Sequence, residues 1–136
     1  MRVKCKWKKG DELAAVYVDT RIHWDNITEW YLTKGKEYVV YAIDSYSGQT
    51  LYYIVDDDEQ WFPIMKPATL FEIVDSRPSS LWRVNFRPLR NSPEEWILTL
   101  AIEEWCAEGA FYERLSDKNE RETAIFAERK KQMDCE

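Results

Sequence analysis

Short β-rich segments that follow one another at a spacing of roughly ten residues most constrain how this chain can fold. These segments are 38–43, 51–55, 61–65 and 70–74. Turn-forming residues separate them, among them Gly35 and Gly48, and Pro63 keeps the third segment short or at an edge. This spacing is typical of a small β-barrel or a rolled sheet.

A further strand is predicted at the N-terminus, where apolar Val3, Cys5 and Trp7 alternate with basic residues. The basic residues are Arg2, Lys4, Lys6, Lys8 and Lys9. Lysines of this kind protect an edge strand from aggregation or form ion pairs within the chain. A basic strand face also suits single-stranded nucleic acid, but the net charge of -6 repels phosphate at long range, so nucleic-acid binding is disfavoured.

The second half predicts a pair of strands. Trp82, Val84 and Phe86 alternate with polar residues, which indicates a strand over 81–87 with one polar face. The apolar run 96–102 is expected to return against it as a strand. The Ser92-Pro93 start also imitates the beginning of a helix, so a helix over 96–102 remains the alternative.

The C-terminal region is helical by composition, over 103–114 and again after Asp117. Asp117 followed by Glu120 matches a capping pattern. The apolar side of the last helix is expected to consist of Thr123, Ala124, Phe126 and Ala127, with Ile125 at its margin. Glu122 is expected in water.

Length and composition limit the number of domains, the compartment and the kinds of site that this chain can have. A chain of 136 residues predicts one domain, 1–136, divided into 1–76 and 77–136. Cys5, Cys106 and Cys135 are odd in number and far apart, and no signal-peptide or membrane-length apolar run occurs, so we expect a cytoplasmic protein. No phosphate-binding loop, dinucleotide motif or zinc spacing is present, and His23 lacks a nucleophile motif. We therefore expect a non-catalytic protein without cofactor or metal.

Turn and core residues give the chain a resemblance to a known group. They are Leu32-Thr33, Gly35-Lys36, Tyr38, Val40, Tyr53, Asp56-Asp57, Trp61-Phe62-Pro63 and 70–74, and downstream Ser80, Trp82, Gly109, Phe111, Glu113, Glu122, Ala124 and Phe126. This pattern resembles an uncharacterised bacterial family of small proteins. The resemblance implies an α+β fold in which an SH3-like barrel of about five short strands is extended by a β-hairpin and closed by one or two C-terminal helices. It implies no reaction. The stretch 11–31 departs from the pattern as a longer insertion.

Aromatic residues are 15% of the chain, with seven Trp and eight Tyr. Rings with a polar edge favour half-buried surfaces, and nearby acids would steer a basic protein toward them. The predicted partner-binding residues are Trp24, Asp25, Trp30, Tyr31, Asp57, Asp58, Glu59 and Trp61. The alternatives are that these rings cap the barrel and that the run 56–59 is a solvated acidic turn.

These features lead to two hypotheses about function. The first is a protein-binding domain that blocks a basic toxin, as immunity-type inhibitors do, by analogy with other small cytosolic domains. The second is a small-molecule or nucleotide-binding domain with its ligand in the barrel mouth. That mouth would be lined by several of Trp24, Trp30, Tyr41, Tyr53 and Trp61.

Overall fold

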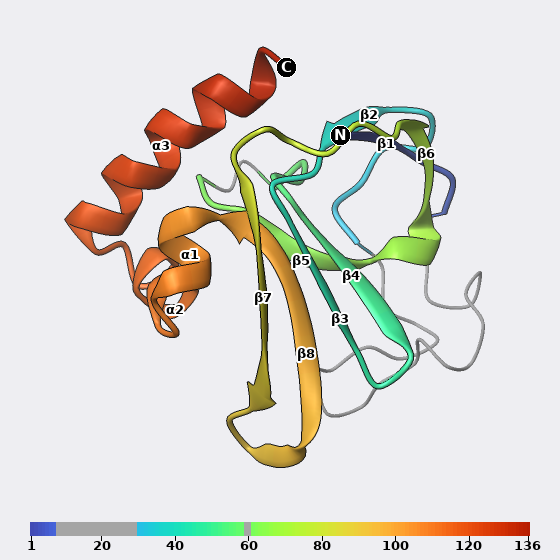
Figure 1. Cartoon of the computed structure of the whole chain (residues 1–136). Coiled ribbons are helices and arrows are strands. Elements are labelled where there is room, and N and C mark those ends of the chain that lie inside the picture. The colour runs from blue at the N-terminus through green and yellow to red at the C-terminus, as the bar shows by residue number, and fades with distance from the viewer. Residues whose placement is uncertain (8–29, 59–60) are drawn as a thin grey trace.

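The computed structural model describes residues 1–7, 30–58 and 61–136, which form an α+β fold (Figure 1). The strands are β1 (Arg2–Cys5), β2 (Glu37–Val39), β3 (Ala42–Tyr46), β4 (Gln49–Ile54), β5 (Ile64–Pro67), β6 (Phe71–Asp75), β7 (Trp82–Leu89) and β8 (Ser92–Ile102). The helices are a 3-10 turn, Ala68–Leu70, and α1 (Glu103–Ala107), α2 (Phe111–Ser116) and α3 (Glu120–Asp134).

The strands form two antiparallel sheets. One sheet has the order β2-β1-β6 and the other the order β5-β4-β3-β8-β7. The two described sheets do not close into the barrel that the sequence predicted. The reason lies in β3, whose second edge pairs with β8, with Ile43 opposite Leu100 and Asp44 opposite Thr99. That edge is therefore not available to the three-stranded sheet.

The predicted strand over 38–43 is divided between the two sheets. Its first part pairs with β1, with Val3 opposite Tyr38. Its second part begins at Ala42 and continues through Tyr46, where a loop was expected. The connection between β3 and β4 consists of only two residues, Ser47 and Gly48, whose φ angles are 49° and 75°. Two consecutive positive φ values are typical of the tight turn that joins antiparallel strands.

Strand β1 lies in the middle of its sheet, between β2 and β6. Edge protection is therefore the wrong explanation for its basic residues, whereas ion pairing within the chain is observed. Lys4 lies 3.7 Å from Glu72 on β6. Both side chains are about half exposed, so this pair contributes only about 0–1 kcal/mol to stability. Lys8 and Lys9 lie outside the described residues.

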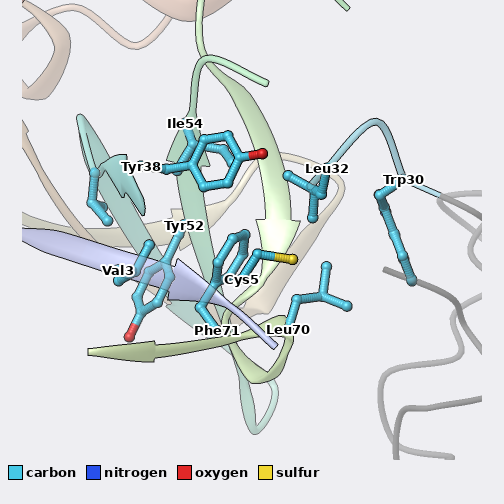
Figure 2. Packing of buried hydrophobic residues seen from close by; sticks show 10 residues of the cluster. Val3, Cys5, Trp30, Leu32, Tyr38, Tyr52, Ile54, Leu70 and Phe71 are labelled. Carbon is cyan, nitrogen blue, oxygen red and sulfur yellow. The ribbon is translucent and has the colours of Figure 1, made fainter. Parts of the chain in front are cut away.

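The first hydrophobic core lies around β1, β2, β4 and β6 (Figure 2). It consists of Val3, Cys5, Trp30, Leu32, Tyr38, Val40, Tyr52, Ile54, Leu70 and Phe71. The rings of Tyr38 and Phe71 meet edge to face, with centroids 6.2 Å apart. Burial of one such apolar side chain stabilises the fold by about 1.5–3 kcal/mol. Several of the abundant rings thus serve packing.

The second core attaches the helices to the five-stranded sheet. Phe111 and Leu115 of α2 and Phe126 of α3 pack around Tyr41. Tyr41 also donates a hydrogen bond to Asp134, at 2.7 Å, so the far end of α3 is held as well.

The buried face of helix α3 agrees with the predicted one at Phe126 but not at Ala124, Ala127 and Glu122. Its buried residues are Glu122, Phe126 and Met133, whereas Ala124 and Ala127 are exposed. Glu122 is buried because Arg121 reaches its carboxylate at 2.9 Å and Arg114 lies 3.6 Å away. A charge can be buried when such partners satisfy it.

The predicted strand pair is confirmed as the hairpin β7–β8. The run 96–102 is a strand, and β8 begins earlier, at Ser92. Figure 1 shows the helices at one end of this hairpin, with its turn extending away from them. The hairpin thus presents two long strand faces, of which the helices cover only part.

Candidate protein-binding surface

The predicted partner-binding residues that the structure describes do not form one surface. Trp24, Asp25 and Glu59 lie outside the described residues. Trp30 is only 5% exposed and belongs to the first core, which leaves it almost no area for a partner. Tyr31, by contrast, is 63% exposed.

Asp57 lies beside Tyr31, because its backbone N–H donates to the Tyr31 carbonyl oxygen at 2.9 Å. Its carboxylate accepts hydrogen bonds from the hydroxyls of Thr33, at 2.6 Å, and Tyr38, at 2.8 Å, and from Lys36. Burial raises the pKa of Asp57, but these hydrogen bonds together outweigh it and hold the pKa below its usual range. Asp57 is thus ionised, and its charge is shared with Lys36.

The acidic run is not uniformly solvated, in contrast to the solvated-turn alternative. Asp56 is buried and forms an ion pair with Lys66 of β5 at 2.7 Å. Asp58 is exposed. Since Asp56 is used internally, only part of the predicted acidic charge faces a partner.

Trp61 packs in the second core, with its ring 4.9 Å from that of Phe62. Together with Ala124 and Ala127 of α3 it lines a pocket of about 530 Å³. The structure therefore groups Tyr31 with Asp57 and places Trp61 against α3.

A different surface gathers exposed apolar residues that the sequence reasoning did not select. Val84 (67% exposed), Phe86 (62%), Trp96 (49%) and Leu98 (38%) lie on one face of β7–β8. We call these four residues the hairpin face. Phe86 lies opposite Leu98 in the register, and the rings of Phe86 and Trp96 are 5.0 Å apart. A contiguous apolar group of this kind on a protein surface marks an interaction site.

Strand β7 is also an edge of its sheet. The Trp82 N–H donates to Ser79, and the Trp82 carbonyl accepts from the Arg83 side chain, so both groups point away from β8. Pro88 has no N–H to donate to the ladder. In an antiparallel pair these directions alternate, so the backbone groups of Val84 and Phe86 also point away from β8. The edge offers donors and acceptors to an additional strand.

The side of β7 opposite the hairpin face is positively charged. Arg83 is exposed and Arg87 is half-buried. Arg90, in the turn that follows, lies 3.6 Å from Glu113, and both side chains are largely exposed. An added strand would therefore meet apolar groups on one face and positive charge on the other.

The signal for this surface was present in the sequence, in the alternation of Trp82, Val84 and Phe86 with polar residues. We interpreted the polar residues as the solvent face. Alternation fixes which residues share a face but not which face is covered. Helix α1 packs on the face that carries the polar residues, since Asn85 donates to the Cys106 carbonyl at 2.8 Å. At the other end of the strands, Trp82 and Ile102 on the apolar face pack into the second core.

No family model, curated protein or solved structure matches this chain. Within the described part of the chain, no group of three or more His, Cys, Asp or Glu residues is arranged to hold a metal ion. None of the helices in the described residues has the length and apolar character needed to span a bilayer.

Proposed function

We propose that this chain is a non-catalytic protein-binding domain whose contact surface is the hairpin face together with the open edge of β7. The main observation that supports this proposal is that four large apolar side chains are exposed on one hairpin. Complete burial of such a side chain contributes roughly 1.5–3 kcal/mol, and a partner would gain the share that corresponds to the exposed area of each residue. A partner that covers all four would gain a hydrophobic centre for the interface.

The partner that fits this surface is an extended segment of another protein that adds to β7 as a strand. Its backbone would pair with Val84 and Phe86, and apolar side chains on one face would contact the hairpin face. An acidic side chain on its other face would lie near the exposed Arg83. The surface thus favours a segment that alternates between apolar and acidic residues.

A narrower form of the proposal is the immunity-type inhibitor of a basic toxin. Tyr31, exposed beside the ionised Asp57, supports it as a second contact point. Asp58 adds an exposed acid near that point.

We also propose that the region of β2 to β6 is related to SH3-like barrels. This proposal rests on β2 to β6, which follow each other as short strands in the region that resembles that fold.

The experiment compares the wild-type chain with Phe86→Ser/Trp96→Ser in capturing proteins from an extract of the organism that makes it. We expect a protein that the wild type retains and the double variant loses. Ile73→Ser/Val74→Ser is the matched control, since these residues are 53% and 42% exposed on the other sheet. The control is expected to retain the same protein.

Amide hydrogen exchange then tests the mode of binding. In the free chain the amides of Val84 and Phe86 should exchange fast and those of Asn85 and Arg87 slowly, because only the latter face β8. In the complex all four should be slow. A protein retained equally by both double variants, or a complex in which Val84 and Phe86 still exchange fast, would contradict the proposal.

A further inference from the structure

A polar pocket of about 140 Å³ lies on the covered side of the same hairpin. The residues that line it are Asp44, Tyr53, Asn85, Arg87, Thr99, Trp105, Gly109, Tyr112 and Glu113. They come from strands β3, β4, β7 and β8 and from the region of α1 and α2. The pocket is independent of the hairpin face, because neighbouring residues of one strand point to opposite sides.

Asp44 is the buried carboxyl group of this pocket. It is 8% exposed, and its two carboxylate oxygens accept hydrogen bonds from the Thr99 hydroxyl at 2.6 Å and the Tyr53 hydroxyl at 2.8 Å. A carboxylate offers about four acceptor positions. Two therefore remain for a ligand that donates hydrogen bonds.

Arg87 supplies a positive charge on the same wall. It stabilises the ionised form of Asp44 through space, yet within the described residues no carboxylate forms an ion pair with it at 4 Å or less. A guanidinium presents a planar fork of donors that matches a carboxylate. The Asn85 amide nitrogen is engaged by the Cys106 carbonyl at 2.8 Å, which fixes that side chain beside Arg87.

Rings form the remaining wall and are held in place. Trp105 and Tyr112 stack with centroids 5.0 Å apart, and Tyr53 meets both edge to face. The Tyr112 hydroxyl donates to the Pro63 carbonyl at 3.0 Å. A preformed wall of this kind lowers the entropy cost of binding a ligand.

The size of the pocket limits the ligand. A volume of about 140 Å³ equals roughly five water molecules at their share of liquid volume. Pockets for drug-sized ligands span roughly 300–1,000 Å³. A nucleotide is therefore too large, and a molecule of amino-acid size fits.

We propose that this pocket binds a small zwitterion, with its ammonium group at Asp44, its carboxylate at Arg87 and its apolar part against Trp105 and Tyr112. An anion without an amine would contact Arg87 but would place no donor at Asp44 or Glu113. A cation without a carboxylate would leave Arg87 unmatched. Only a ligand that carries both charges satisfies both walls.

The test uses three probes of similar size: L-alanine, propionate and ethylamine. Each is titrated at pH 7 into the ¹⁵N-labelled full chain, and the amide signals of Asp44, Asn85 and Thr99 are followed. L-alanine should shift these signals to saturation at about 10 mM, as a Kd of about 1 mM requires. Propionate and ethylamine should bind at least about tenfold more weakly.

Arg87→Met should weaken L-alanine binding at least about tenfold, whereas Arg90→Met should leave it unchanged. Asp44→Asn should also weaken L-alanine binding. If Asp44→Asn does not fold, Arg87→Met alone still tests the proposal. Three results would overturn the proposal: no shift with L-alanine, equal binding of propionate or ethylamine, and unchanged binding in Arg87→Met.

Discussion

The two faces of the hairpin β7–β8 depart from the usual distribution of polar and apolar residues along β7, whereas β8 also buries apolar Ile97 and Ala101 on the covered face. The face turned toward α1 and α2 carries Asn85, Arg87 and Thr99 around the buried Asp44. The other face exposes Val84, Phe86, Trp96 and Leu98. A sheet with one covered face ordinarily places its apolar residues inside and its polar residues in water. Stability of the isolated fold does not explain this departure.

The two faces of the hairpin differ in what they contribute to stability and to binding. The covered face carries polar groups, of which Asp44 and Asn85 are hydrogen-bonded, and these groups line a pocket. The uncovered face gains nothing for the fold while it stays in water. We infer that both faces serve binding and that the stability of the domain comes from the two cores. The predictions that follow test this separation.

The largest effect is expected from two Phe→Ala substitutions of identical chemistry. Phe111 is fully buried in the second core, and Phe111→Ala should lower the free energy of unfolding by about 3–5 kcal/mol. Phe86 is 62% exposed, and Phe86→Ala should change it by less than about 1 kcal/mol. Urea denaturation measures both. Equal losses would show that the hairpin face is part of the folding core.

Within the polar pocket, Tyr53→Phe should remove one donor from the Asp44 carboxylate. Because that group is buried, we expect a loss of about 1–3 kcal/mol in the free energy of unfolding. Tyr31→Phe is the control, since Tyr31 is 63% exposed. A Tyr53→Phe variant as stable as the wild type would mean that a water molecule enters the pocket and replaces the lost hydrogen bond to Asp44.

The pH dependence of stability should reveal Asp44 directly. Burial raises the pKa of Asp44 above 3.8, although hydrogen bonds from Thr99 and Tyr53 and the charge of Arg87 act in the opposite direction. Tyr112 and the Cys106 thiol also face this carboxyl. Between about pH 4 and the raised pKa of the folded state, the unfolded chain has lost this proton while the folded chain retains it. The contribution of Asp44 to stability is thus greatest at low pH and falls as pH rises through the folded pKa.

The measurement compares wild type with Asp44→Asn between pH 4 and pH 7. The free energy of unfolding of the wild type should fall relative to the variant, by about 1.4 kcal/mol for each tenfold change in the ionisation equilibrium. Acids with lowered pKa values, such as Asp57 and Glu104, act in the opposite direction and are common to both chains. A constant difference between the two chains would place the Asp44 pKa at its ordinary value.

Local sequence patterns predicted most elements because they reflect local chemistry. The strand over 96–102 and the helices after it follow from residue type and periodicity. What the patterns did not contain was pairing between distant segments. The pairing of β3 with β8 places Ile43 opposite Leu100 within the five-stranded sheet, and it is not visible in either segment alone.

The candidate site was harder to predict for the same reason. Trp30 and Phe86 are both aromatic residues near strands, yet one is 5% and the other 62% exposed. Trp30 is buried by distant strand residues of the first core, and the exposure of Phe86 depends on which part of the hairpin the helices cover. Asp44 follows the predicted strand 38–43 directly, and only its place opposite Thr99 makes it part of a pocket.

The smallest effect is expected from Arg90→Gln, at the turn of the hairpin. Arg90 lies 3.6 Å from Glu113 of α2, with both side chains largely exposed. Water screens such a pair, so the free energy of unfolding should change by less than about 0.5 kcal/mol. Thermal denaturation at low and high salt provides the measurement. A loss above about 1 kcal/mol that disappears in salt would show that charge ties the hairpin turn to α2. The hairpin would then be an integral part of the folded body, and the separation between binding faces and stabilising cores would no longer hold at its tip.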